Sequence, residues 1–104
     1  MTAPLTIRKP AGTPKGGVVV IQEAFGVTAH IEDVCDRLAE AGYLAVAPAM
    51  FHRQGSPIVA YDDIPAAIEV MSQLTPADMA ADVDDALEYL QSEGLTQAQC
   101  GITG

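Results

Sequence analysis

The sequence predicts a three-layer α/β/α domain built on a doubly wound, mostly parallel sheet. Two runs, 18–21 and 43–47, are continuously apolar, as expected of parallel strands that are covered on both faces. An amphipathic helix is predicted between them, and strand, helix and strand within about 30 residues form a right-handed crossover. Because helices and strands continue to alternate, we expect helices on both faces of one sheet.

The first half of the chain supplies the elements around these runs. A short strand at 5–8 and a turn-rich connection at 10–17 precede the first run. The helix after that run has Thr28 as its expected N-cap and Gly42 at its end. Pro48 is expected to stop the second run. The helix carries one apolar stripe, formed by Ile31, Val34, Cys35, Leu38 and Ala39.

The rest of the chain is predicted to hold a loop, two helices and a strand. Residues 49–63 show no periodicity and form the loop, and a short helix lies within 64–74. A longer helix begins after Thr75, with Pro76 at its first helical position, and Cys100 opens the last strand. We expect the longer helix to bury Met79, Val83, Ala86, Leu87 and Leu90. Its outer face is expected to carry Asp78, Asp82, Asp85 and Glu88.

The predicted sheet has no helix after its last strand. A parallel strand normally leads into a helix that covers one face of the sheet, and nothing of that kind follows residues 100–103. We therefore expect residues 1–104 to be the N-terminal portion of a single, larger α/β domain.

Composition limits the classes of partner. The chain has 5 Lys and Arg against 14 Asp and Glu, and its net charge of −9 disfavours nucleic acid and anionic membrane surfaces. No apolar run approaches the roughly 20 residues of a membrane span, and no apolar segment follows Arg8 and Lys9 as in a signal peptide. We therefore expect a cytoplasmic protein.

The sequence offers no cofactor or metal site. Cys35 and Cys100 have no His or Cys at ligand spacing, so a zinc site is not expected. Neither apolar run leads into the glycine-rich loop that a phosphate site needs. A flavodoxin-like or receiver-type domain is a remote alternative, since it would need such a loop or an acidic pocket at the strand ends.

Open α/β sheets bind ligands at the carboxyl ends of their strands. Glu23 is the only carboxylate at these ends, and Phe25 would shield it in part from water, as suits a proton-transfer group. The Ala24 N–H lies just past the strand, where it could face a developing oxyanion. The alternative is that Glu23 caps the following helix or pairs with Arg53.

Two histidines and an arginine are further candidates. His52 could line a pocket or be exposed, and Arg53 could bind a substrate carboxylate or form a surface ion pair. His30 lies at the start of the first helix and is expected to be solvated.

Four stretches of the chain form a recognisable set: GVVVIQEAFG at 17–26, AGYLAVAP at 41–48, FHRQ at 51–54 and GITG at 101–104. Together they resemble the N-terminal half of a dienelactone hydrolase family protein, over essentially the whole chain. The resemblance implies an α/β-hydrolase fold that continues into a nucleophile elbow, G-x-C-x-G, with Gly104 as its first glycine. The nucleophile, a Cys or a Ser, would lie beyond Gly104.

The resemblance also implies roles for residues in this chain. Glu23 matches the family's glutamate, which contacts the resting thiol and takes its proton when substrate arrives. Ala24 matches the residue whose N–H forms half of the oxyanion hole, and Arg53 lies in the family's loop after the strand. Apart from the resemblance, we expect Phe25, His52 and Arg53 to contact the substrate. In this fold the catalytic Asp and His that complete the triad come after the nucleophile in the chain. The resemblance therefore implies that neither His30 nor His52 is the catalytic base.

The chain departs from the family pattern at two places. Ala49 stands where the family often has Asp, and residues 55–104 contain no Arg or Lys to bind a substrate carboxylate. Another ester or lactone is therefore as well supported as dienelactone. We expect a hydrolase of carboxylic esters or lactones, with the isolated chain inactive. The alternative is a non-catalytic α/β module that self-associates through its unfinished sheet.

Overall fold

The sheet is mostly parallel, with one antiparallel strand at its edge. A computed structural model describes residues 3–103 and orders their four strands β1-β3-β2-β4. β2 pairs in parallel with β3 and β4, whereas β1 pairs antiparallel with β3. The strands span Leu5–Arg8 (β1), Gly17–Val20 (β2), Leu44–Pro48 (β3) and Cys100–Thr103 (β4). The predicted sheet is therefore confirmed.

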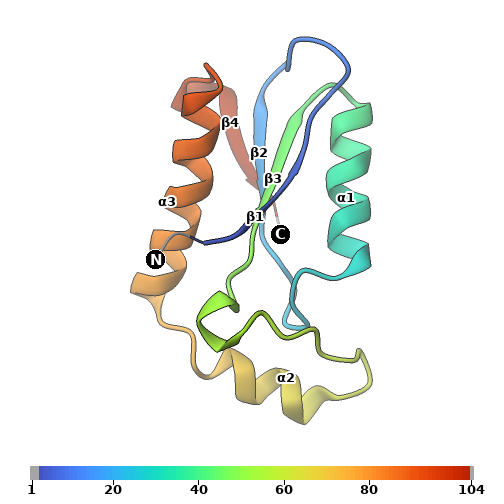
Figure 1. The fold of residues 1–104 in the computed structure, drawn as a ribbon, viewed down its shortest axis with the longest axis vertical. Coiled ribbons are helices and arrows are strands. Elements are labelled where there is room, and N and C mark those ends of the chain that lie inside the picture. Colours follow the sequence, from blue (N-terminus) through green and yellow to red (C-terminus); the bar gives the residue numbers. More distant parts are fainter. Residues whose placement is uncertain (1–2, 104) are drawn as a thin grey trace.

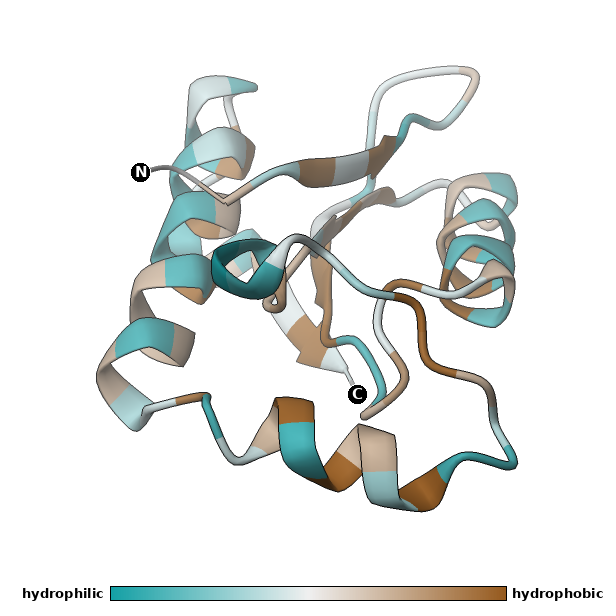
Figure 2. Ribbon diagram, turned by 60° about the horizontal axis from the view of Figure 1, so that its bottom comes forward, coloured by the Kyte–Doolittle hydropathy of each residue, from teal (hydrophilic) through white to brown (hydrophobic). Residues whose placement is uncertain are grey.

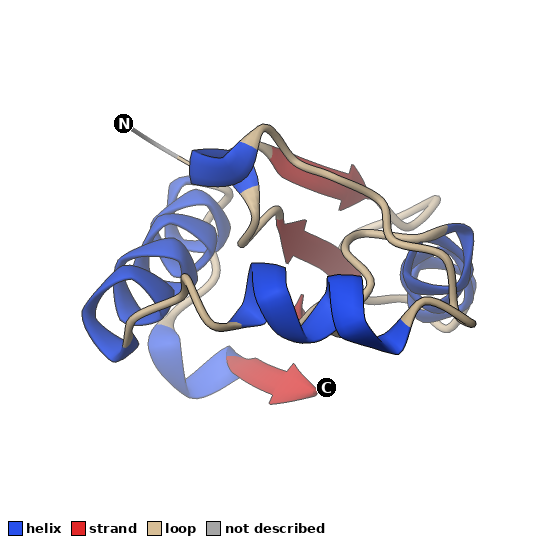
Figure 3. Cartoon of the chain, turned by 90° about the horizontal axis from the view of Figure 1, so that it is seen from below, coloured by secondary structure: helices blue, strands red, loops and turns tan. Residues whose placement is uncertain are grey.

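Helices cover both faces of the sheet. α1 (Ala29–Glu40) lies on one face and α3 (Pro76–Ser92) on the other, which gives the predicted three layers (Figure 1). α2 (Ile64–Met71) lies beyond the carboxyl ends of the parallel strands, in front of the sheet when the molecule is seen from below (Figure 3). Short 3-10 turns, η1 (His52–Gln54) and η2 (Gln97–Gln99), complete the described elements.

Each face of the sheet has its own apolar core. Side chains alternate along a strand, so Val19 packs toward α3 while its neighbour Val20 packs toward α1. All of β3 is buried, which explains why its sequence shows no polar alternation. Hydrophobic residues accordingly line the strands, while much of the helices is hydrophilic (Figure 2). The α3 side buries Val19, Leu44, Val46, Ala86, Leu90 and Leu95, and the α1 side buries Val20, Ile31, Cys35, Ala45 and Ala47.

The helix ends follow the predicted capping chemistry, with one exception. Thr75 Oγ1 accepts the Asp78 N–H at 3.1 Å and begins α3. Gly42, with φ of +100°, follows the end of α1 in a conformation that suits glycine. Thr28 stands at the N-cap position of α1, but its Oγ1 accepts the Tyr61 hydroxyl at 3.0 Å and no helix N–H.

One predicted surface position is wrong: Asp82 is fully buried and does not lie on the outer face of α3. Positions 82, 86 and 90 share one side of a helix, and in α3 this is the side that packs inward. An aspartate is tolerated there because basic side chains from the loop after β3 bind it, as described below.

Smaller differences concern element boundaries. β2 begins and ends one residue before the predicted run, and β3 includes Pro48, which pairs with Leu5 of β1. The loop at 49–63 contains the turn η1. No helix within residues 3–103 is both long and apolar enough to cross a membrane.

Candidate active site

The chain leaves β2 through a tight turn, residues 22–26, which we call the exit turn. The Gly26 N–H donates to the Glu23 carbonyl at 3.1 Å and closes the turn. Gly26 has φ of +99°, and a Cβ there would lie 2.6 Å from the Pro57 carbonyl oxygen. Glycine is therefore required for both backbone conformation and close approach of the loop.

The loop after β3 holds the exit turn from outside. The Met50 N–H donates to Gln22 Oε1 at 2.7 Å, and the Val59 N–H donates to the Phe25 carbonyl at 2.9 Å. The Phe25 ring packs edge-on against Tyr61, with 4.7 Å between centroids. These contacts fix the backbone around Glu23 and Ala24.

One oxygen of the Glu23 carboxylate lies near His30, and the other has no hydrogen-bond partner among the described residues. Oε1 lies 3.6 Å from His30 Nε2, on the first turn of α1. Oε2 is buried and has no hydrogen-bond partner among the described residues. A buried, unpaired carboxylate oxygen is costly, so its presence calls for an explanation. Glu23 also lines a cavity of about 350 Å³, together with Val20, Ile21, Gln22, His30, Ile31, Val34 and Thr103.

The backbone next to Glu23 also has a free donor. No hydrogen bond within residues 3–103 uses the N–H of Ala24, the residue after Glu23 in the exit turn. A preorganised N–H at a strand end can stabilise negative charge that develops on a bound carbonyl oxygen.

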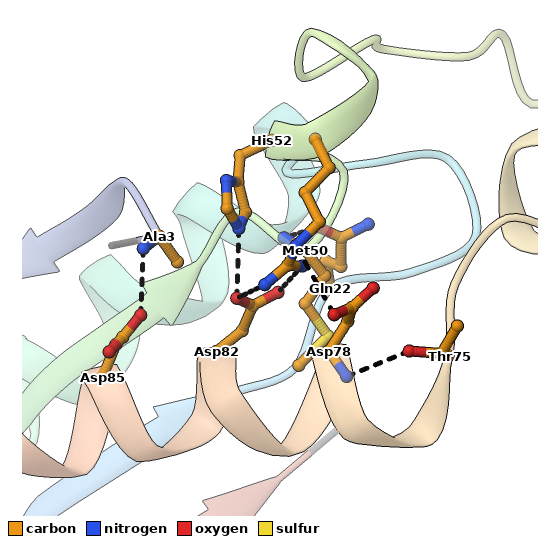
Figure 4. Close-up of polar contacts among 9 residues, drawn as sticks. Ala3, Gln22, Met50, His52, Thr75, Asp78, Asp82 and Asp85 are labelled. Atoms are coloured by element: carbon orange, nitrogen blue, oxygen red, sulfur yellow. Dashed lines mark hydrogen bonds and ion pairs between the residues drawn. The ribbon is translucent and has the colours of Figure 1, made fainter. Parts of the chain in front are cut away.

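His52 and Arg53 both bind Asp82 of α3. Figure 4 shows the contact between His52 and Asp82. Within the described residues, neither forms a hydrogen bond or an ion pair with Glu23. His52 Nε2 lies 3.1 Å from Asp82 Oδ1, and Arg53 forms two bonds of 3.1 Å to the two carboxylate oxygens. The hydrogen bond to Asp82 raises the pKa of Arg53, so the guanidinium stays charged. The alternative that Glu23 pairs with Arg53 is therefore not supported by this arrangement.

The sequence is similar to that of a known protein family. The model of the dienelactone hydrolase family matches residues 3–104. The chain belongs to the dienelactone hydrolase family.

Two curated relatives and a crystal structure show how much of the family fold it spans. Proteins named "Putative carboxymethylenebutenolidase" from Methylorubrum extorquens and Escherichia coli K12 are 39% identical over 94 residues and 36% identical over 97 residues. These matches cover 89% and 92% of this chain, but only 32% and 35% of the relatives. The crystal structure of a "Putative Dienelactone Hydrolase" from Klebsiella pneumoniae is 38% identical with a TM-score of 0.85, covering 98% of this chain and 43% of that one. The chain thus spans about a third of the length of these curated relatives.

The structure of this family member places the predicted site residues in two groups. Glu23, Ala24 and Phe25 lie in the exit turn, whereas His52 and Arg53 lie against α3. Sequence reasoning missed His30 as a neighbour of Glu23. It lies seven positions after Glu23, on the helix that starts directly after the exit turn, and this spacing is the only signal that could have found it. Within residues 3–103, no cluster of three His, Cys, Asp or Glu could hold a metal ion.

Proposed function

We propose that this chain supplies the Glu23 and Ala24 half of the active site of an ester or lactone hydrolase. The observation that carries the proposal is the buried Glu23 Oε2, which lacks a partner within the described part of the chain, on a residue that lines the cavity. Family membership supplies the reaction class, and the nucleophile is proposed to lie beyond residue 104.

In the proposed reaction, Glu23 Oε2 accepts the proton of a cysteine thiol. The thiolate then attacks the acyl carbon, forming an S–C bond as the carbonyl becomes an oxyanion. The Ala24 N–H donates to this oxyanion. Collapse breaks the acyl C–O bond, and the departing alkoxide takes the proton held by the Glu23 carboxyl and leaves as an alcohol. Water then adds to the thioester carbonyl, and cleavage of the S–C bond gives the acid and the free thiol.

The proposed substrate is a small ester or lactone without a carboxylate of its own. Substrate contacts by Phe25, His52 and Arg53 stay predictions, but the Arg53 fork is already occupied by Asp82. Residues 55–104 contribute no Arg or Lys that could replace it. A neutral substrate avoids leaving a substrate carboxylate unpaired at this part of the site.

The product of the complete open reading frame that carries this sequence tests the proposal. We expect it to encode G-x-C-x-G or G-x-S-x-G from Gly104 onward, and to hydrolyse 4-nitrophenyl acetate. The 104-residue chain alone should show only the background rate, since it would lack the nucleophile. A reading frame that ends at Gly104, or one without a Cys or Ser in this motif, would refute the proposal.

Association is the second candidate function, and the structure of β4 favours it. β4 pairs only with β2 within the described sheet, and Ile102 is 58% exposed. A strand edge with an exposed apolar side chain invites pairing with a second copy. We expect the isolated chain to elute earlier from a size-exclusion column as its concentration rises, and Ile102→Lys to reduce this shift. A monomer at every concentration would contradict association.

A further inference from the structure

We propose that His30 is a positioning residue for Glu23: it holds Oε1 of the carboxylate, so that Oε2 turns inward, where it has no partner among residues 3–103. The inference rests on the proposed function, because it concerns how the proton acceptor of that reaction is oriented. His30 does not itself exchange a proton with the substrate.

The orientation of the Glu23 carboxylate needs a cause. A buried carboxylate oxygen without a donor is unfavourable, and an unrestrained glutamate would rotate to bring both oxygens to water. The Glu23 side chain is 35% exposed, so such a rotation has room. Its 3.6 Å approach to His30 Nε2 is the one polar contact recorded for the carboxylate among residues 3–103. We assign to this contact the outward orientation of Oε1 and the inward orientation of Oε2.

Both ends of the contact are fixed by the backbone. The exit turn holds Glu23 through the bond from the Gly26 N–H to the Glu23 carbonyl. His30 is on the first turn of α1, after Thr28, whose hydroxyl accepts the Tyr61 O–H. The positive end of the α1 dipole adds to the attraction for the Glu23 carboxylate. At 3.6 Å the contact is longer than a hydrogen bond, and it becomes an ion pair when the imidazole is protonated.

The consequence concerns the cavity. Glu23, His30 and Thr103 all border it, at the carboxyl ends of β2 and β4. With Oε1 held by His30, Oε2 is the oxygen without a partner among residues 3–103, and we infer that it accepts a proton from a group that approaches from beyond β4. Under the proposed function, that group is the nucleophile.

The test uses the product of the complete open reading frame and 4-nitrophenyl acetate. We expect His30→Ala to lower kcat about two- to fivefold with KM unchanged, because an exposed ion pair makes a small contribution. The His30 side chain is 59% exposed, so the variant should fold. His30→Lys places a permanent positive charge at this position and should restore most of the rate. Asp33→Ala is the matched control on the same helix, because Asp33 pairs with Arg37, and it should leave kcat unchanged.

A double variant separates positioning from a general structural effect. In a Glu23→Gln background, His30→Ala should cause no further loss, because the carboxylate that it orients is gone. Losses that multiply, or a His30→Ala variant with full activity, would overturn the inference while the proposed function stands. A Glu23→Gln variant with full activity would instead overturn the proposed function.

Discussion

Glu23→Gln is expected to lower kcat for 4-nitrophenyl acetate by about 10²- to 10⁴-fold in the product of the complete open reading frame, the range typical of a lost acid–base group. Glutamine has nearly the same shape, so it preserves the packing of the exit turn. It cannot take a proton from the nucleophile, which then remains largely in its unreactive, protonated form. The rate of alkylation of the nucleophile by iodoacetamide should fall together with kcat.

Glu40→Gln is the matched control for this change. Glu40 is an exposed carboxylate at the far end of α1, so the substitution removes the same charge at a distance from the exit turn. We expect its kcat and alkylation rate to equal those of the parent protein. Equal rates in the Glu23 and Glu40 variants would show that Glu23 is not the proton acceptor.

Local pattern was sufficient to predict most of the fold. The run at 18–21 is apolar at every position because Val19 and Val20 face opposite cores, and such burial is visible in sequence. The order of the strands in the sheet could not be predicted from local pattern. β1 pairs with β3 and bypasses β2, the next strand in the chain, and the four half-buried residues of β1 carry no signal for that choice.

The candidate site was predictable only where it follows a strand directly. Glu23 and Ala24 were found because a strand end is a defined place in an α/β sheet. The sequence did not predict which groups the charged side chains bind. Asp82 reads as a surface residue by its type, and only its four-residue spacing from Ala86 places it on the buried side. Its burial depends on His52 and Arg53, some 30 positions earlier, which no periodicity connects to α3.

Asp82→Ala should be the most destabilising single change in α3, with a loss of about 3 kcal/mol in the free energy of unfolding. The Asp82 side chain is 1% exposed and that of His52 3% exposed, so removal of the carboxylate leaves the imidazole and the Arg53 guanidinium without their acceptor. The expected loss lies at the low end of the range for buried pairs because the Arg53 side chain is 29% exposed and water can reach it in part. Urea unfolding of the 104-residue chain, followed by circular dichroism, measures it.

Asp84→Ala is the control for this change. It shows whether a loss of stability comes from the network that Asp82 forms with His52 and Arg53, or from the substitution of any aspartate of α3. Asp84 is exposed, two positions along α3, and alanine has the higher helix propensity, so this control should be neutral or slightly stabilising. Asp82→Asn keeps the size of the side chain and an acceptor oxygen, and we expect its stability to fall between those of Asp82→Ala and the parent chain.

Since the network also fixes the start of the loop that holds the exit turn, a loss at Asp82 should loosen Met50 and Val59 against Gln22 and Phe25. If Asp82→Ala and Asp84→Ala unfold at the same urea concentration, the buried carboxylate does not anchor this loop.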